Sequence, residues 1–264
     1  MTPLRVLALC AGIGGLELGL HLAEPSSAPV AFVERDDFAR TVLASRWPGV
    51  PISEDVFDFN ATPWKGIANV VTAGFPCQPW SLAGRRQGTA DERWIWPRIA
   101  EIVREVLPYY VFLENVPGLV SNGGLEKVLG SLAALGFDAE WGVFSCAALG
   151  ASHRRERVFV VAHTNSQRLP QRQEQHHLEL EATQRAGDDG LGLGVWAPGP
   201  DADWSLYPPA FWPAEQPLCG VANGFPRQLE PDRRARLRAL GNAVSPPVAA
   251  TAWTILRSRL RRHL

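Results

Sequence analysis

Short apolar stretches alternate with longer amphipathic stretches along residues 1–162, and this alternation restricts the fold more than any other feature of the sequence. The apolar stretches have the length of buried strands, and the stretches between them carry apolar residues at helical spacing. Strands that alternate with helices form βαβ units, which build a mostly parallel sheet with helices on both faces. The sequence therefore predicts an α/β fold of the doubly wound type. The expected strands are Val6–Leu9, Ala31–Val33, Asn69–Ala73, Tyr110–Leu113 and Arg157–Ala162, and the expected helices are one ending near Leu22, Phe38–Trp47, Arg98–Leu107 and Leu125–Leu135.

The pattern changes after His163. Residues 164–190 are rich in Gln, Arg and Glu, and residues 194–217 are rich in Pro and Trp, which is typical of irregular structure. Regular patterning returns near Arg227, where a basic stretch leads to a turn at residues 241–247 and then to an apolar helix from Val248. We therefore expect three parts: a catalytic domain (residues 1–163), an irregular region (164–226) and a C-terminal segment (227–264) that returns to the first.

The net charge of −1 excludes a polycation that binds nucleic acid with its whole surface. The charge is unevenly divided: residues 1–162 carry −3, residues 163–226 carry −5 and residues 227–264 carry +7. A nucleic acid would therefore have to bind at a local basic patch, and the C-terminal segment is the place where one is expected.

The four cysteines, Cys10, Cys77, Cys146 and Cys219, are widely spaced and form no Cys-x-x-Cys pair. This spacing argues against a disulfide framework and against a zinc site, so no metal is expected. The sequence has neither the organisation of a signal peptide nor an apolar run of about 20 residues. A reducing, cytoplasmic location without a membrane span is the expectation.

A glycine-rich loop, Ala11-Gly12-Ile13-Gly14-Gly15, directly follows the first expected strand. Such a loop lets a ligand approach bare backbone and the N-terminus of the next helix. It is not a dinucleotide fingerprint, because Glu17 stands where the third glycine would fall, and no phosphate-loop Lys follows. Glu34 and Asp55 each follow a later expected strand, and two acids at strand ends suit a nucleoside without phosphates. A tight turn with no ligand is the alternative interpretation.

Cys77 lies in Gly74-Phe75-Pro76-Cys77-Gln78-Pro79-Trp80-Ser81, just after the third strand and thus at the edge where open α/β sheets bind ligands. A cysteine there can act as a nucleophile, although a lone cysteine is often only a small core residue. No signature of a papain-type or caspase-type protease surrounds it. Glu114 follows the next strand, so it would share the crevice with Cys77. A raised pKa would let it act as a general acid.

Taken together, these segments resemble the cytosine-C5 DNA methyltransferase family of prokaryotes and phages, in the family's order and over most of the chain. The glycine loop resembles the family's first motif, Gly74-Phe75-Pro76-Cys77-Gln78 its nucleophile motif, and Glu114-Asn115-Val116 its carboxylate motif. Residues His153-Arg154-Arg155-Glu156-Arg157 resemble its arginine motif, and Leu240-Gly241-Asn242-Ala243-Val244 its last motif. The departures are Ala8 for Asp, Cys10 for Phe, His153 for Gln and Ala243 for Ser, and none of them removes a group that the chemistry needs.

The resemblance implies an S-adenosylmethionine-dependent, Rossmann-like methyltransferase domain with a small, irregular target-recognition region. It implies that a target cytosine flips out of the duplex, that Cys77 attacks C6 while Glu114 protonates N3, and that C5 takes the methyl group. Arg155 and Arg157 fall on the family's arginines near the base, where a guanidinium can bind O2. The implied cofactor residues are Ala11, Gly12, Ile13, Gly14, Gly15, Glu34, Asp55, Val56, Pro76, Asn242, Ala243 and Val244, and the implied DNA contacts are Gln78, Ser81, Arg85, Arg86, Arg227 and Arg234.

The region that would read DNA, residues 164–226, is short and acidic, although DNA phosphates attract positive charge. Phosphate contacts are therefore expected from the nucleophile loop and the C-terminal arginines, unless the latter only form a solvated helix face. The expected partners of a monomeric enzyme are double-stranded DNA and, in a restriction-modification system, a cognate restriction endonuclease. Two alternatives stay open: a tRNA cytosine-C5 methyltransferase, whose Cys-Phe-Thr signature is missing at residues 110–113, and a DNA-binding protein with impaired catalysis.

Overall fold

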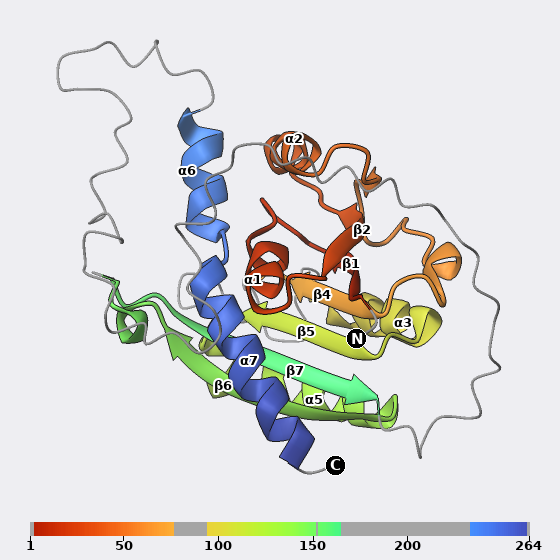
Figure 1. Cartoon of the computed structure of the whole chain (residues 1–264), viewed down its shortest axis with the longest axis vertical. Helices are drawn as coiled ribbons and strands as arrows, with labels where there is room; N and C mark the ends of the chain where they lie inside the picture. The colour runs from red at the N-terminus through yellow and green to blue at the C-terminus, as the bar shows by residue number, and fades with distance from the viewer. Residues whose placement is uncertain (1–2, 77–93, 152, 165–232, 263–264) are drawn as a thin grey trace.

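A computed structural model of the chain describes residues 3–76, 94–151, 153–164 and 233–262. These residues form a seven-stranded sheet in the order β3-β2-β1-β4-β5-β7-β6, with helices on both faces (Figure 1). The strands are β1 (Arg5–Leu9), β2 (Ala28–Val33), β3 (Ile52–Ser53), β4 (Val70–Gly74), β5 (Tyr110–Asn115), β6 (Phe137–Ser145) and β7 (Glu156–Thr164). The α-helices are α1 (Gly15–Ala23), α2 (Asp37–Arg46), α3 (Trp96–Val106), α4 (Gly118–Ser121), α5 (Gly124–Ala134), α6 (Arg233–Asn242) and α7 (Pro246–Arg262), and 3-10 turns span Thr62–Trp64 and Ala147–Leu149.

The first five strands are parallel and confirm the doubly wound α/β fold that the alternation predicts. The chain moves outward from β1 through β2 to β3, and then returns to add β4 and β5 on the other side of β1. The order of the strands thus reverses between β1 and β4. In open α/β sheets, ligands bind at the carboxyl ends of the strands beside such a reversal.

The last two strands, β6 and β7, run antiparallel to their neighbours. The sequence did not predict β6, because this strand lies at the edge of the sheet and its polar residues, such as Asp138 and Glu140, weaken the apolar pattern. Because β7 is antiparallel to β5, its first residues lie beside the last residues of β5: Val158 pairs with Asn115, and Phe159 pairs with Glu114.

The two faces of the sheet carry separate cores. Helices α3 and α5 cover one face, and α1 and α7 cover the other, which faces the viewer in Figure 1. The α3–α5 core contains Leu7, Val71, Val111, Ile99, Ile102, Val128 and Leu132, all fully buried. The α1–α7 core contains Val6, Val70, Phe112, Leu16, Leu20, Trp253 and Leu256. Burial of aromatic and branched side chains on both faces stabilises the sheet and fixes the register of its central strands.

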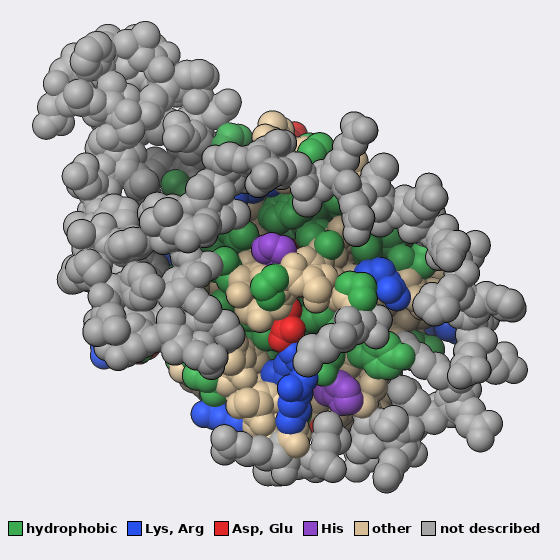
Figure 2. All heavy atoms as spheres, in the orientation of Figure 1, with side chains coloured by type: hydrophobic (Ala, Val, Ile, Leu, Met, Phe, Trp, Pro, Cys, Tyr) green, Lys and Arg blue, Asp and Glu red, His purple; other side chains and the backbone are tan. Residues whose placement is uncertain are grey.

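Helices α1 and α7 cross in close contact, because α1 has glycines where α7 approaches. A β-carbon on Gly15 would collide with the carbonyl oxygen of Val244, and one on Gly19 would collide with Ala249. At the other end of α1, Glu24 accepts a hydrogen bond from Trp253 Nε1 at 3.2 Å and forms an ion pair with Arg257. Basic and acidic side chains meet at this face in the space-filling view (Figure 2). The C-terminal helix is therefore an integral layer of the domain.

The structure differs from the sequence prediction at the turn before α7. Helix α6 continues through Gly241 and Asn242, and α7 begins at Pro246 rather than Val248. Proline fits the first turn of a helix because that turn leaves its backbone N–H groups unpaired in any case. Among the described helices, none is at once long enough and apolar enough to cross a membrane.

Candidate functional site

The residues singled out from the sequence converge at the carboxyl ends of β1, β2, β4 and β5. The register pairs Gly74, the last residue of β4, with Glu114 of β5, and a β-carbon on Gly74 would lie 3.7 Å from Glu114 Oε2 and 3.6 Å from Cys10 O. The glycine at position 74 thus leaves room at the point where β1, β4 and β5 end. Cys77 itself, with Gln78, Ser81, Arg85, Arg86 and Arg227, lies outside the described residues, as does the side chain of Arg234.

The glycine loop is shaped by backbone conformations that favour glycine. Gly12 and Gly14 have φ angles of +56° and +81°, and Gly14 caps the N-terminus of α1. The loop is joined to the end of β2, because Gly12 N donates to Glu34 Oε2 at 2.7 Å. The other oxygen of Glu34 accepts from Asp36 N at 2.8 Å. Burial raises the pKa of Glu34, while backbone hydrogen bonds from Gly12 and Arg35 and the positive charges of Arg40 and Arg238 act in the opposite direction.

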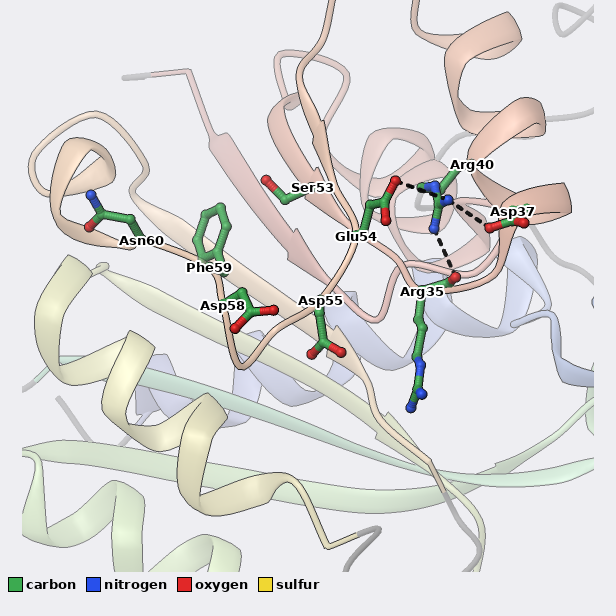
Figure 3. Close-up of a pocket in the computed structure, with 9 residues that line it drawn as sticks. All are labelled: Arg35, Asp37, Arg40, Ser53, Glu54, Asp55, Asp58, Phe59 and Asn60. Atoms are coloured by element: carbon green, nitrogen blue, oxygen red, sulfur yellow. Dashed lines mark hydrogen bonds and ion pairs between the residues drawn. The ribbon is translucent and has the colours of Figure 1, made fainter.

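Asp55 lies on the wall of a cavity of about 490 Å³ beside the end of β2. Asp55 Oδ1 accepts from Phe57 N at 2.9 Å, and the neighbouring Val56 is buried. In Figure 3 the side chains of Asp55 and Arg35 extend in the same direction along this cavity. The other lining residues are Asp37, Arg40, Ser53, Glu54, Asp58, Phe59 and Asn60. The cavity is lined by two arginines as well as four carboxylates, and Arg40 pairs with both Asp37 and Glu54. Asp55 and Asp58 add carboxylate oxygens that can accept hydrogen bonds from hydroxyl or amino groups.

Glu114 is a buried carboxyl group with a raised pKa. Its side chain is buried, and its Oε1 forms an ion pair with Arg157 Nε at 2.9 Å. Burial raises the pKa of Glu114 to about 7, while the positive charges of Arg157 and Arg155 act in the opposite direction. A general-acid role at this position requires a raised pKa, and the burial of Glu114 supplies one. At neutral pH, both the acid and the carboxylate are populated.

Asn115 connects the end of β5 to the chain that leads into the nucleophile motif, a contact that the sequence did not predict. Its Nδ2 donates to the carbonyl oxygen of Phe75 at 3.1 Å, and its Oδ1 accepts from Val116 N at 2.9 Å. Asn115 is buried, so both ends of its amide are committed to these partners. Asn115 therefore fixes the backbone two residues before Cys77. Its position directly after Glu114 was the only signal available in the sequence.

The two arginines that the sequence places near the base occupy different positions. Arg157 lies against Glu114, whereas Arg155 Nη2 donates to Gly241 O at 2.8 Å and to Ala243 O at 2.5 Å. These contacts bring the last motif to the carboxyl edge of the sheet. There Val244 lies against Gly15, at the start of α1. The expected cofactor residues of the first and last motifs are thus neighbours in space.

Helix α6 packs beside α2, near the end of β2. Arg238 of α6 forms an ion pair with Asp36, the residue that caps α2, and its positive charge also acts on the nearby Glu34. Arg238 belongs to the C-terminal arginines from which phosphate contacts are expected, and in the structure it has an acidic partner on the protein. Within the described part of the chain, no three His, Cys, Asp or Glu side chains are grouped so as to hold a metal ion.

Glu17 is an unexpected buried acid below the glycine loop. Its side chain is 3% exposed, and its Oε1 accepts from Thr72 Oγ1 of β4 at 2.6 Å. Oε2 has no hydrogen-bond partner among the described residues. Burial raises the pKa of Glu17 to about 7, against the lowering effect of Thr72. In the sequence, Glu17 only excludes a dinucleotide fingerprint, and no pattern around it predicts burial.

We expect the buried Glu17 to make the protein less stable as the pH rises. The folded protein binds this proton more tightly than the unfolded chain does, so the free energy of unfolding falls between about pH 4.5 and pH 7. The total loss from this one group is on the order of 3 kcal/mol, at about 1.4 kcal/mol per pKa unit between 4.5 and about 7. Glu17→Gln keeps an acceptor for Thr72 and cannot ionise, so it should reduce the decline. Urea unfolding at pH 5 and pH 8 measures this effect, and parallel pH curves for wild type and variant would contradict the prediction.

Comparison with known proteins identifies the family. The family model "C-5 cytosine-specific DNA methylase" matches residues 4–189. The chain is 33% identical over 159 residues to the Type II methyltransferase M.CviJI of Paramecium bursaria Chlorella virus IL3A, a match that covers 60% of this chain and 42% of the viral protein. It is 28% identical to the Type II methyltransferase M2.BsuMI of Bacillus subtilis, over 95% of this chain and 74% of that protein.

The fold also matches solved structures. The Dnmt2 structure from Spodoptera frugiperda superposes with a TM-score of 0.53 and 20% identity, over 65% of this chain and 54% of that one, and so supports the Rossmann-like methyltransferase fold. For the first curated relatives, this chain spans only 42% and 37% of their length. The family model, in contrast, covers well over half of the chain, and it includes the glycine loop, Glu34, Cys77, Glu114 and both arginines. The chain belongs to the C-5 cytosine-specific DNA methylase family.

Proposed function

We propose that the chain is an S-adenosylmethionine-dependent DNA (cytosine-5) methyltransferase. The observation that carries the proposal is Glu114: a buried carboxyl with a pKa of about 7 beside Gly74, the residue that begins the Gly-Phe-Pro-Cys-Gln motif. A group that is protonated in part at neutral pH can donate a proton to a ring nitrogen in one step and recover it in another. Cytosine-C5 methylation requires such a donor next to a nucleophile.

In this mechanism, the target cytosine leaves the duplex, because its C5 and C6 are not accessible inside the base stack. The thiolate of Cys77 forms a bond to C6, and Glu114 gives its proton to N3, so the ring becomes electron-rich at C5. Arg157 stays at the carboxylate and helps to balance the negative charge there, while a base removes the C5 proton and Cys77 is then eliminated. S-adenosylmethionine, when bound, supplies the methyl group that C5 accepts.

The residues at the carboxyl ends of β1 and β2 suit that cofactor. The glycine loop lets a ligand lie against bare backbone, and Glu34 and Asp55 offer carboxylates to a ribose and an amino group. Because the cofactor has no phosphates, the surrounding negative charge does not repel it. We assign its binding to Ala11, Gly12, Ile13, Gly14, Gly15, Glu34, Asp55, Val56, Pro76, Asn242, Ala243 and Val244. Together these residues would hold both ends of the cofactor beside Glu114.

We further propose that duplex DNA is bound from the carboxyl edge of the sheet. The nucleophile loop, with Gln78, Ser81, Arg85 and Arg86, and the C-terminal arginines Arg227 and Arg234 are assigned to DNA. Residues 164–226 are assigned to target recognition. The enzyme would act as a monomer in the cytoplasm of a bacterial or phage-infected cell, either alone or beside a restriction endonuclease, which the Type II names of its relatives support.

Direct sequencing of methylated bases in DNA from cells that express the chain tests this function and reports the target sequence at the same time. We expect 5-methylcytosine at one short recognition sequence, and none in cells that carry Cys77→Ser. The purified protein should transfer methyl groups to duplex DNA and not to tRNA in parallel reactions. Methylation of tRNA alone would replace the proposal with its nearest alternative. Tight binding of DNA without any transfer would favour a protein that has lost catalysis.

A further inference from the structure

We propose that Arg155 is a positioning residue that holds the segment 241–244 in place, so that this segment completes the cofactor crevice, and that Arg155 does not contact the flipped base. The proposal rests on the proposed function, because it assigns a role in binding S-adenosylmethionine. It assigns different roles to two arginines, Arg155 and Arg157, that lie only two residues apart. Arg157 forms an ion pair with Glu114, whereas Arg155 holds the backbone of the last motif, beside the proposed cofactor site.

The first support is the geometry of the guanidinium group. Arg155 Nη2 donates to two carbonyl oxygens of the last motif, those of Gly241 at 2.8 Å and Ala243 at 2.5 Å. Gly241 lies near the end of α6 and Ala243 lies just beyond it, where helix carbonyls have no partner within the helix. A planar, always charged guanidinium suits two acceptors that are so close to each other, and hydrogen bonds from charged donors are the strong ones.

The second support is the position of the segment that Arg155 holds. Val244 directly follows Ala243, and its carbonyl oxygen lies against Gly15, at the junction of the glycine loop and α1. Displacement of the carbonyls at 241 and 243 would therefore shift the wall that faces the glycine loop. The contact joins residues that are 86 and 88 positions apart in the sequence, so no local structure can replace it.

The third support is the turn that carries Arg155. Its φ angle is +31°, in a region that residues other than glycine rarely adopt, so the surrounding contacts must hold this conformation. The carbonyl oxygen of the preceding Arg154 accepts from Cys146 N at 3.0 Å and from Ser145 Oγ at 2.7 Å. The turn is thus anchored to β6 on one side. Within three residues, it presents one arginine to the last motif and another to Glu114.

The test compares Arg155→Ala and Arg155→Lys with Arg154→Ala, which removes an exposed arginine from the same turn. Two charged hydrogen bonds are lost in Arg155→Ala, so we expect its Kd for S-adenosylhomocysteine, measured by calorimetry, to rise roughly tenfold or more. The KM for S-adenosylmethionine should rise in parallel, and kcat at saturating cofactor should change less than about threefold. Arg155→Lys should recover part of the affinity, and Arg154→Ala should behave as wild type.

A second readout does not depend on the cofactor. In the free protein, the backbone amides of residues 241–245 should exchange hydrogen faster in Arg155→Ala than in Arg154→Ala, while the amides of β4 and β5 stay protected. A large fall in kcat with unchanged cofactor affinity would overturn the proposal and place Arg155 at the base. Unchanged exchange at 241–245 would also overturn it. If wild type binds no S-adenosylhomocysteine, the proposed function fails, and the exchange measurement still decides whether Arg155 holds the segment.

Discussion

Cys77→Ser is expected to lower methyl transfer to DNA by at least about four orders of magnitude, because the reaction loses its nucleophile. A serine hydroxyl has a far higher pKa than a thiol, and a neutral hydroxyl does not add to C6 of a pyrimidine at a useful rate. The loss should appear in kcat, since the side chain that is changed carries the bond-forming step. Transfer of tritiated methyl groups from the cofactor to duplex DNA measures it.

Covalent trapping of the enzyme on DNA that contains 5-fluorocytosine tests directly whether Cys77 forms the bond to the base. In DNA that contains 5-fluorocytosine at the target, the C5 fluorine cannot leave as a proton does, so wild type should stay bonded to the base through Cys77. Cys77→Ser should form no such adduct, although it should still bind S-adenosylhomocysteine within about threefold of wild type. Cys146→Ser makes the same exchange at a thiol buried in the α1–α7 core and should still be trapped. An adduct in Cys77→Ser, or full methylation by it, would disprove the assignment.

Glu114→Gln is expected to lower kcat by about 10² to 10⁴, the usual contribution of a positioned general acid. An amide has nearly the same shape as the acid but cannot give a proton to N3. The pH dependence should change as well. Because the pKa of Glu114 is raised to about 7, wild type should lose activity as the pH rises through 7 and the proton is lost. The variant should lack this decline.

The groups that face Glu114 in the structure, together with a control variant, allow the pH profile to be assigned to Glu114. Arg157 of β7 pairs with the carboxylate, Arg155 acts on it through its charge, and Gly74 of β4 leaves the space beside Oε2. Glu126→Gln, the same exchange at an exposed position on α5, serves as the matched control and should leave both kcat and its pH profile unchanged. Single-turnover rates from pH 5.5 to 8.5 give the comparison. A Gln variant with wild-type rates at pH 6 would exclude the general-acid role.

Features that depend on a strand end could be predicted from the sequence. Glu34, Gly74 and Glu114 each follow an apolar stretch, so strand periodicity alone places them at the same edge of a parallel sheet. The glycine loop was equally visible, because Gly12 and Gly14 stand where the chain must turn from β1 into α1. The raised pKa of Glu114 could not be predicted from the sequence, since burial and the approach of Arg157 depend on the three-dimensional fold.

Contacts between distant segments could not be predicted in this way. Asn115 donates a hydrogen bond to Phe75 O, and Arg155 donates hydrogen bonds to Gly241 O and Ala243 O. The sequence around Asn115 and Arg155 contains no pattern from which these distant partners could be predicted. The edge strand β6 was missed because its mixed polar residues obey neither a helical nor a strand period clearly. The burial of Glu17 was missed for a related reason: a charged residue in an amphipathic helix is normally assigned to the solvent face.

The close crossing of α1 and α7 has a consequence for folding. Glu24 and Trp253, which hold the two helices together, are 229 positions apart, and such distant contacts form slowly because a long loop must close first. On the ribosome, the glycine loop emerges early, but the helix that packs behind it is made much later. The contact between Val244 and Gly15 therefore cannot form until the C-terminal segment has been synthesised. Competence to bind the cofactor should thus be one of the last properties that the nascent protein acquires.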